Sequence, residues 1–269
     1  MTTTSNILEQ LFSLAGKTAL ITGASGGIGR GLAVGLASAG AAVAVHGRKR
    51  DEIDKTCAQV EAAGGKALPL AADLAEPGTP KQLVAATVAG LGRLDILINC
   101  AATNRRNPIS DVTEDDYDFI MTVNLKSAYF LTQAAYPHMR DQGGGKVIHI
   151  GSINAYYGLD TVSVYGASKG GLVQQTKVMA VEWARDNIQV NCIIPGFFHT
   201  PLSEPLWADP EKSHWFRSRI PMRRPGEPEE MVGLAIFLAS PASNYITGES
   251  IIIDGGFSAG GSWHRDEQV

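Results

Sequence analysis

Short hydrophobic runs alternate along the chain with segments in which apolar residues recur at helical spacing. Seven runs are apolar almost throughout, as strands are when helices cover both faces of their sheet; they span residues 18–21, 41–46, 67–70, 94–99, 146–151, 188–194 and 250–254. The segments of helical period between them include residues 27–38, 50–63, 80–91, 124–140, 164–186 and 228–240. This alternation predicts an α/β fold, a doubly wound parallel sheet of about seven strands with helices on both faces.

One segment, residues 196–227, does not follow this alternation. It is rich in proline and holds two of the four tryptophans of the chain. Connections in compact α/β domains are short, and long irregular segments often serve as lids or binding loops. We therefore expect this segment to border a substrate site, with a plain surface insertion as the alternative. No linker or block of charge divides the chain, so we expect a single domain over residues 1–269.

The composition and charge of the chain exclude several classes of binding partner. The chain carries 23 basic and 27 acidic residues, a net charge of −4, and has no basic run. Such a chain is a poor candidate for binding nucleic acid or an anionic membrane surface. No apolar run approaches the roughly 18 residues of a membrane span, and the first residues do not read as a signal peptide. The three cysteines, Cys57, Cys100 and Cys192, match no zinc spacing. We expect a cytoplasmic protein without a metal site.

A glycine-rich turn, TGASGGIG at residues 22–29, follows the first predicted strand and opens the first helix. This is the context of a Rossmann-like dinucleotide site. Gly23 would allow the tight turn, Gly27 would let the backbone approach a pyrophosphate, and Gly29 would let the helix pack closely on the strand. The helix N-terminus would then offer free N–H groups to the phosphates. The spacing differs from G-x-G-x-x-G, so a glycine turn without a ligand is the alternative at this point.

The end of the second strand bears on the choice of cofactor. Residues 45–50 read Val-His-Gly-Arg-Lys-Arg and contain no carboxylate that could bond a ribose 2′-OH. Arg48 could instead clasp a 2′-phosphate through two N–H groups. This favours NADP(H), with NAD(H) as the alternative, unless the arginines are only a solvated helix start. We expect Asp73, after the third strand, to face the adenine.

Tyr165 and Lys169 are four residues apart at the start of a predicted helix, so their side chains share one face. Tyr165 is the only one of seven tyrosines followed by lysine at this spacing. A nearby ammonium favours the ionised form of a phenol, so the pair could work as an acid or a base. Ser152 follows a strand end and could hold a substrate oxygen beside Tyr165. The pattern Tyr-x-x-x-Lys is common by itself, so it indicates a catalytic pair only in combination with the other motifs.

These features occur in a fixed order along the chain that resembles the short-chain dehydrogenase/reductase family from Gly16 to about Gly256. The resemblance implies reversible hydride transfer between a nicotinamide cofactor and a secondary alcohol or ketone, and commonly a homotetramer. The motifs that carry it are TGASGGIG at 22–29, Asp73-Leu74, Asn99-Cys100-Ala101-Ala102, Val123-Asn124, Ser152, Tyr165 with Lys169, Pro195-Gly196 with Thr200, and Asp254-Gly255-Gly256.

The resemblance also implies roles for single residues. Tyr165 would be the general acid or base, and Lys169 would support its ionisation and bind the nicotinamide ribose. Ser152 would orient the reacting oxygen, and Asn124 would hold the water that links Lys169 to solvent. Cofactor contacts are implied for Gly23, Ser25, Gly26, Gly27, Ile28, Gly29, Arg48, Asp73, Leu74, Asn99, Ala101, Tyr165, Lys169, Pro195, Gly196 and Thr200.

Two positions depart from the family's pattern. Ala102 replaces a glycine that often lies near the adenosine, from which we expect a slight backbone shift. Gly26 stands where a basic residue would be a further sign of NADP.

Residues 104–108, 160–165 and 220–228 resemble the branch that holds gluconate 5-dehydrogenase and 2-deoxy-gluconate 3-dehydrogenase. Members of this branch interconvert keto and hydroxy sugar acids, and an arginine pair would suit an anionic group. Substrate contacts are therefore expected for Ser152, Tyr165, Arg105, Arg106, Asn154, His199 and Trp207, and the pocket could be completed by His214, Trp215, Arg217 and Arg219.

Other interpretations stay open. Arg105 and Arg106 could be surface charges or could contact a neighbouring subunit. A 3-oxoacyl thioester reductase shares the same core motifs. A non-catalytic cofactor sensor is a third hypothesis, although such proteins usually lack the tyrosine or the lysine.

Overall fold

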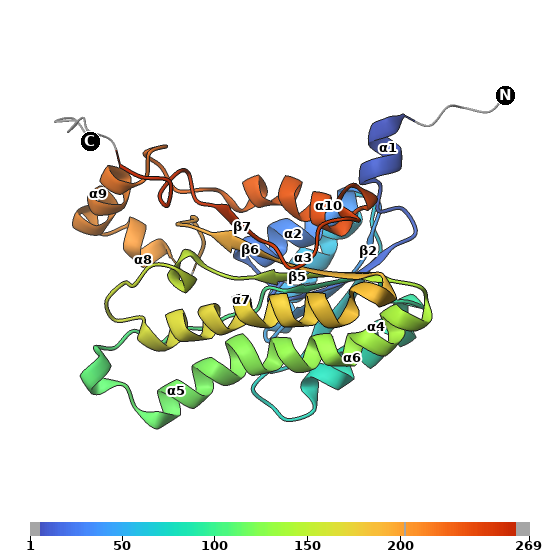
Figure 1. Ribbon diagram of the computed structural model, residues 1–269, viewed down its shortest axis with the longest axis horizontal. Helices are drawn as coiled ribbons and strands as arrows, with labels where there is room; N and C mark the ends of the chain where they lie inside the picture. Colours follow the sequence, from blue (N-terminus) through green and yellow to red (C-terminus); the bar gives the residue numbers. More distant parts are fainter. Residues whose placement is uncertain (1–5, 202, 262–269) are drawn as a thin grey trace.

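All seven predicted strands are present in the computed structural model, which describes residues 6–201 and 203–261 (Figure 1). They pair in parallel in one sheet with the order β3-β2-β1-β4-β5-β6-β7. This confirms the predicted doubly wound parallel sheet, while the prediction of a single domain stays a prediction. The strands are β1 (Thr18–Thr22), β2 (Ala42–Gly47), β3 (Ala67–Ala71), β4 (Ile96–Asn99), β5 (Gly145–Ile150), β6 (Ile188–Pro195) and β7 (Ser250–Ile253).

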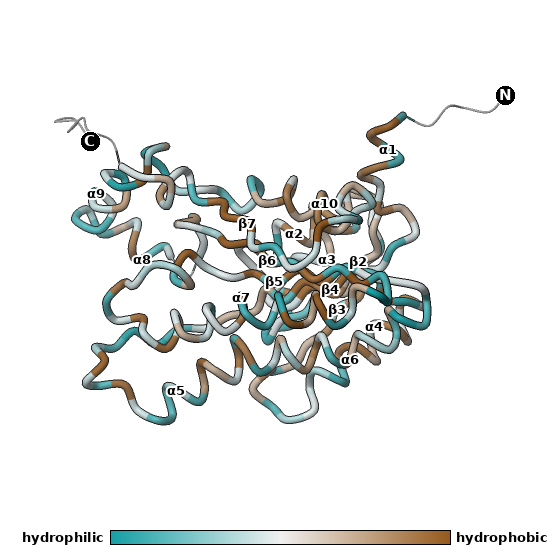
Figure 2. The backbone as a smooth tube through the Cα atoms, viewed as in Figure 1, coloured by the Kyte–Doolittle hydropathy of each residue, from teal (hydrophilic) through white to brown (hydrophobic). Residues whose placement is uncertain are grey.

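Helices cover both faces of the sheet (Figure 1). One layer holds α2 (Gly27–Ser38), α3 (Arg50–Ala62) and α10 (Val232–Ala239), and the other holds α4 (Thr79–Leu91), α6 (Ser127–Asp141) and α7 (Ser163–Trp183). Every residue of β1, β4 and β6 is buried, which explains why these strands are mostly apolar in sequence. Figure 2 shows the hydrophobic colours concentrated along the central strands. No helix of the described residues is long and apolar enough to span a membrane.

The strand order places a switch point between β1 and β4. From β1 the chain runs outward to β2 and β3, then returns to β4 on the other side of β1. The last residues of the two strands, Thr22 and Asn99, are paired in register. Ligands of open parallel sheets bind outside the carboxyl ends of the strands at such a point.

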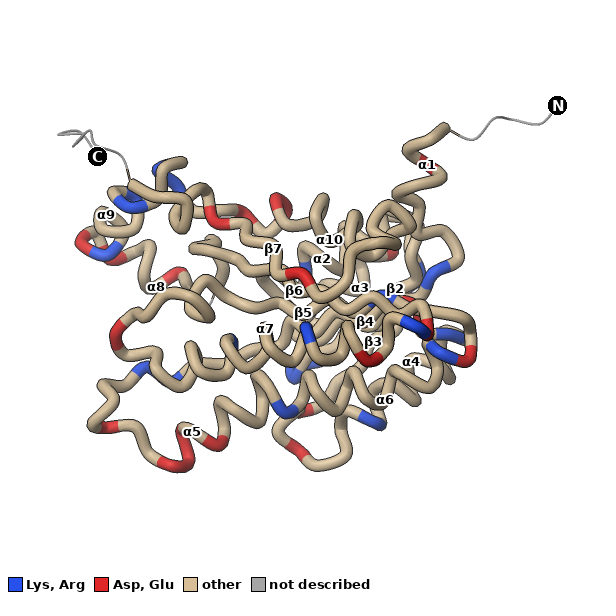
Figure 3. The backbone as a smooth tube through the Cα atoms, in the orientation of Figure 1, with Lys and Arg blue, Asp and Glu red and all other residues tan. Residues whose placement is uncertain are grey.

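The helical segment before α6 is longer than predicted. We expected one helix over residues 124–140, but helix α5 (Glu114–Met121) comes first and continues through a π-helical turn, Thr122–Lys126, into α6. Thr113 caps α5 by accepting a hydrogen bond from the N–H of Asp116. Four of the first five residues of α5 are Asp or Glu, so the segment did not read as an apolar helical stretch; Figure 3 shows acidic residues along this helix. Helix α1 (Ile7–Phe12) was also not predicted.

The segment 196–227 is not irregular as we expected, because it contains two short helices. They are α8 (Glu204–Trp207) and α9 (Pro210–Arg219), and each has a proline in its first turn. Proline is compatible with the first turn of a helix, where its missing N–H would have no partner. Asp209 caps α9 through the N–H groups of Glu211 and Lys212. Two of the prolines that suggested a loop, Pro205 and Pro210, therefore mark helix starts. The predicted helix over residues 228–240 is likewise divided into a 3₁₀ turn, Pro228–Met231, and α10.

Candidate active site

A cavity of about 910 Å³ lies at the carboxyl ends of the strands and contains most of the predicted site residues. Cofactor candidates that line it are Gly23, Ser25, Gly26, Gly27, Ile28, Gly29, Arg48, Asp73, Leu74, Ala101, Tyr165, Lys169, Pro195, Gly196 and Thr200. Substrate candidates that line it are Ser152, Asn154, Tyr165, Arg106 and Trp207. Of the residues predicted to act in catalysis or to contact cofactor or substrate, the structure places Asn99, Asn124, Arg105 and His199 outside this lining.

The glycine turn depends on the absence of side chains. Gly23 has φ 69°, and a Cβ there would lie 2.7 Å from the Cα of Ala101. A Cβ on Gly29 would overlap the carbonyl oxygen of Gly23. Gly27, at the first residue of α2, also has a positive φ, 50°, and faces the side chain of Thr200. The backbone therefore passes close to the cavity at the start of α2, where N–H groups can receive phosphate oxygens.

Two polar residues that we did not predict hold this turn. The imidazole of His46 accepts a hydrogen bond from the N–H of Gly23 through Nδ1, and its Nε2 lies 3.2 Å from the carbonyl oxygen of Ala72. Burial lowers the pKa of His46 to about 4, so the ring is neutral and can accept on one nitrogen and donate on the other. Thr22 accepts from the N–H groups of Cys100 and Ala101. In the sequence, both residues could have been noticed as polar side chains near the ends of otherwise apolar strands.

Arg48 is free to meet an anion at this end of the cavity. Its side chain lines the cavity and is exposed, and no described residue pairs with it. The neighbouring Arg30 is occupied, because its Nη2 donates to the carbonyl oxygen of Ser25 at 2.6 Å and pairs with Glu52 at 2.9 Å. The glycine cradle, the start of α2 and Arg48 together fit the pyrophosphate and phosphorylated ribose of a dinucleotide.

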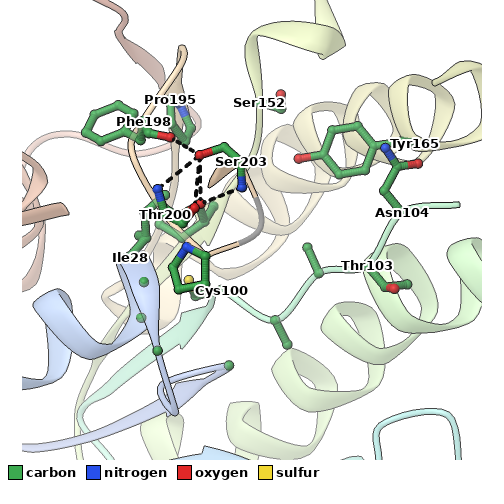
Figure 4. Close-up of a pocket in the computed structure, with 18 of the residues that line it drawn as sticks. Ile28, Cys100, Thr103, Asn104, Ser152, Tyr165, Pro195, Phe198, Thr200 and Ser203 are labelled. Atoms are coloured by element: carbon green, nitrogen blue, oxygen red, sulfur yellow. Dashed lines mark hydrogen bonds between the residues drawn. The ribbon is translucent and has the colours of Figure 1, made fainter. Parts of the chain in front are cut away.

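Three of the four predicted catalytic residues, Ser152, Tyr165 and Lys169, line the cavity just after β5 and in the first two turns of α7. Lys169 is 2% exposed, and its Nζ donates to the carbonyl oxygen of Ile150 at 2.7 Å. That nitrogen also lies 5.6 Å from the centre of the Tyr165 ring. The Tyr165 hydroxyl points toward Ser152 (Figure 4), whose Oγ accepts from the N–H of Asn154. An ammonium, a phenol and an aliphatic hydroxyl therefore share one wall of the cavity.

Asn124 and Asn99 lie behind this wall. Asn124, in the π-helical turn, accepts from the N–H of Thr103 at 2.8 Å and donates to the carbonyl oxygen of Thr103 and the hydroxyl of Ser168. Its side chain thus joins the loop after β4 to α7, and its expected role in holding a water stays a prediction. Asn99 donates to Thr132 at 3.0 Å and to Nδ1 of His149 at 3.1 Å. It sits beneath the cavity rather than in contact with it.

At the other end of the cavity the two predicted arginines differ. Arg106 lines the cavity, and no described residue pairs with its guanidinium. Arg105 pairs with Asp115 and Asp116 instead, both at 2.8 Å. His199 pairs with Glu204, the first residue of α8. Arg105 and His199 are thus engaged outside the cavity, and direct substrate contacts by them stay predictions.

Apolar residues that we did not single out form much of the substrate wall. Phe119 from α5, Leu159 from the loop before α7 and Phe216 from α9 line the cavity, and Trp207 packs against Phe216 with ring centres 5.2 Å apart. His214, Trp215, Arg217 and Arg219 belong to the same helix as Phe216 but are not part of this lining. An apolar side chain looks the same in a sequence whether it lines a pocket or packs in the core, so these residues could not be singled out.

Thr200 is fixed at the edge of the cavity by a local hydrogen-bond cluster, drawn in Figure 4. Its N–H donates to the Oγ of Ser203 at 3.0 Å, and Ser203 donates in turn to the carbonyl oxygen of Phe198. The segment after β6 therefore closes over the start of α2. Among the described residues, no group of three or more His, Cys, Asp or Glu side chains is placed to hold a metal ion.

Comparison with known proteins agrees with this geometry. The chain matches the family model described as enoyl-(acyl carrier protein) reductase over residues 23–258. It is 40% identical over 248 residues to the gluconate 5-dehydrogenase of Gluconobacter oxydans (strain 621H), an alignment that covers 92% of this chain and 97% of that relative.

Two solved structures are similar over nearly the whole chain. The gluconate 5-dehydrogenase from Burkholderia cenocepacia J2315, in complex with NADP and tartrate, is 37% identical with a TM-score of 0.89 and covers 94% of this chain and 99% of its own. The 3-oxoacyl (acyl-carrier-protein) reductase from Agrobacterium tumefaciens C58, with NADP bound, is 38% identical with a TM-score of 0.90 and covers 95% and 99%. The chain therefore belongs to the short-chain dehydrogenase/reductase family and is an NAD(P)-dependent oxidoreductase acting on CH–OH groups.

Proposed function

We propose that the chain oxidises a secondary alcohol, or reduces the matching ketone, of a sugar acid or related anionic sugar, with NADP(H) as the preferred cofactor. The observation that carries the substrate class is Arg106, a guanidinium without a partner among the described residues at the substrate end of the cavity. A guanidinium matches the two oxygens of a carboxylate in geometry and charge. The gluconate 5-dehydrogenases among the similar proteins, one of them in complex with tartrate, support the same class.

The proposed roles follow from the positions of the side chains. When bound, the nicotinamide supplies or accepts the hydride. Tyr165 exchanges a proton with the reacting oxygen through its hydroxyl, and Ser152 holds that oxygen by a hydrogen bond. Lys169 places its Nζ 5.6 Å from the centre of the Tyr165 ring, beside the group that exchanges the proton. The carbonyl oxygen of Ile150 fixes Nζ of Lys169 in this place.

Cofactor preference gives the first prediction. We expect Arg48→Asp to lower kcat/KM with NADP by roughly a hundredfold, because a charge-assisted bond to the 2′-phosphate becomes a repulsion. The value with NAD should change by less than about threefold, because a carboxylate can accept from the free 2′-OH. Steady-state kinetics with both cofactors measure this.

Lys49→Asp provides the matched control, because it changes the same charge at the next residue, outside the cavity lining. It should leave the preference between NADP and NAD within about twofold. A wild type that is equally efficient with NAD, or an Arg48→Asp variant that keeps its efficiency with NADP, would refute the proposed preference.

The substrate class is tested by a dehydrogenase screen combined with Arg106→Gln. We expect turnover of aldonates or related anionic sugars, and a kcat/KM for them that falls roughly 10- to 100-fold in Arg106→Gln. Neutral polyols of the same length should change little, since they have no charged group to lose. Arg185→Gln, in the turn beyond the far end of α7, is the control for a lost surface charge.

The same screen separates the alternatives. A 3-oxoacyl thioester reductase is the second candidate, supported by the similarity to the reductase from Agrobacterium tumefaciens. Higher efficiency with an acetoacetyl thioester than with every sugar acid would favour it over our proposal. Absence of turnover with any alcohol or ketone, despite cofactor binding, would favour a cofactor sensor.

We also propose a homotetramer located in the cytoplasm. Exposed apolar residues on the outer layer support an assembly; they are Tyr129 and Phe130 on α6 and Val178 and Val181 on α7. All three cysteines are free thiols, which suits a reducing compartment.

A further inference from the structure

Arg105 and Arg106 are adjacent in sequence but are held in different ways. They lie in the 103–108 loop, which connects β4 to the elements before α5. Arg106 lines the cavity, whereas Arg105 is directed to α5. Besides its two ion pairs, the guanidinium of Arg105 lies 4.3 Å from the centre of the Phe119 ring. Because Phe119 itself lines the cavity, Arg105 supports the substrate wall from behind.

Asp116 is the better buried of the two carboxylates on Arg105. Its side chain is 15% exposed, compared with 86% for Asp115. One oxygen of Asp116 accepts from Arg105 at 2.8 Å, and the other accepts from the side-chain amide of Asn107 at 3.1 Å. Asp116 therefore joins two residues that flank Arg106 in sequence and fixes both to the first turn of α5.

The 103–108 loop is also tied to the segment that precedes Tyr165. The N–H of Asn107 donates to the carbonyl oxygen of Thr161 at 3.1 Å. Thr161 has φ 62°, a left-handed conformation that is uncommon for a residue other than glycine. It stands two residues before the start of α7, which carries Tyr165 in its first turn. A chain of contacts thus runs from α5 through Asp116 and Asn107 to the base of the catalytic helix.

We propose that Asp116 is a positioning residue for substrate binding: through Arg105 and Asn107 it fixes the 103–108 loop and so holds Arg106 at the substrate end of the cavity. Arg105 is then a support for its neighbour and not a ligand of the substrate. The inference rests on the proposed function only in assigning the anionic group of the substrate to Arg106.

Kinetics of Asp116→Asn, a variant of the same size and shape, test the inference. With NADP and the best aldonate of the screen, we expect KM for the aldonate to rise roughly tenfold while kcat changes less than about twofold. The Kd for NADP should stay within about twofold, because the glycine turn and Arg48 are distant from α5. Arg105→Gln should act in the same direction.

A double-mutant cycle shows whether the effect passes through Arg106. In an Arg106→Gln background, Asp116→Asn should add less than about twofold, because the side chain that it positions is already lost. Asp115→Asn is the matched control: it removes the exposed partner of Arg105 and should change KM less than about twofold. Effects of Asp116→Asn and Arg106→Gln that simply multiply would overturn the proposal. An unchanged KM in Asp116→Asn would also overturn it, because Arg106 would then not depend on Asp116, and so would a lower KM, because freeing Arg105 would then have improved binding.

Hydrogen exchange measures the positioning without a substrate. Asp116→Asn should speed exchange in residues 103–108 and 156–162 by roughly tenfold or more, and leave residues 22–29 unchanged. Asp115→Asn should not do so. If this pattern is seen while Arg106→Gln leaves every substrate unaffected, the proposed substrate class fails and the positioning stands. Unchanged exchange in Asp116→Asn would exclude the positioning itself.

Discussion

Replacing Tyr165 by phenylalanine is expected to lower kcat by roughly 10²- to 10⁴-fold, the range that a positioned acid or base contributes. The substitution removes one oxygen and keeps the ring, which lies 5.6 Å from Nζ of Lys169. It should therefore leave the fold, the position of Lys169 and the Kd for NADP nearly unchanged. The loss should fall on kcat and kcat/KM together, because the proton transfer matters in the transition state and little in substrate binding.

Single-turnover and steady-state measurements with the best substrate of the screen provide this test. Tyr156→Phe is the matched control, since Tyr156 lies nearby in the sequence, is 52% exposed and does not line the cavity. It should keep turnover within about twofold of the wild type. A Tyr165→Phe enzyme with near-normal kcat would mean that another group carries the proton, and the role assigned to the Tyr165–Lys169 pair would be wrong.

The sheet could be predicted because buried parallel strands need apolar side chains on both faces. Every residue of β1 and β6 is buried, and both strands are mostly apolar; the exceptions are the terminal threonines of β1 and Gln189 and Asn191 in β6. The glycine turn was predictable for a related reason. At Gly23 the backbone of Ala101 occupies the place where a side chain would be, and at Gly29 the backbone of Gly23 in the same turn does so, so few residue types fit.

The substrate end was harder to predict because its residues are defined by partners far away in the sequence. Two adjacent arginines carry the same local signal, yet Arg105 turns to Asp115 and Asp116 while Arg106 lines the cavity. Helix α5, which supplies those carboxylates, begins with a largely acidic stretch and was not identified as a helix from its apolar pattern. A sequence pattern records which residues can bind an anion, and tertiary contacts decide which of them is free to do so.

The acid sensitivity of the fold is the second large effect that the structure predicts. His149 is fully buried on β5, and burial, aided by the charge of Lys169, lowers its pKa to about 3. Burial also lowers the pKa of His46 to about 4. In the unfolded chain both residues titrate near 6.5. Between that pH and the folded values, only the unfolded state takes up the protons, so acid favours unfolding.

The sign and size of the effect follow from these values. Both histidines are neutral in either state well above pH 6.5, so they cause no pH dependence there. As the pH falls to 4, each should remove roughly 3 kcal/mol from the free energy of unfolding, a large part of the stability of an ordinary domain.

Urea unfolding at a series of pH values from 7 to 4 measures this loss. We expect His149→Gln to lower the free energy of unfolding at pH 7, because it disturbs the hydrogen bond from Asn99. Between pH 6.5 and 4, however, the variant should lose roughly 3 kcal/mol less of that free energy than the wild type. Carboxylates contribute equally to both proteins, so the difference isolates His149. His138→Gln, at an exposed position near the end of α6, should keep the wild-type slope. If His149→Gln and the wild type lose stability in parallel, His149 is not the buried neutral base that its surroundings require.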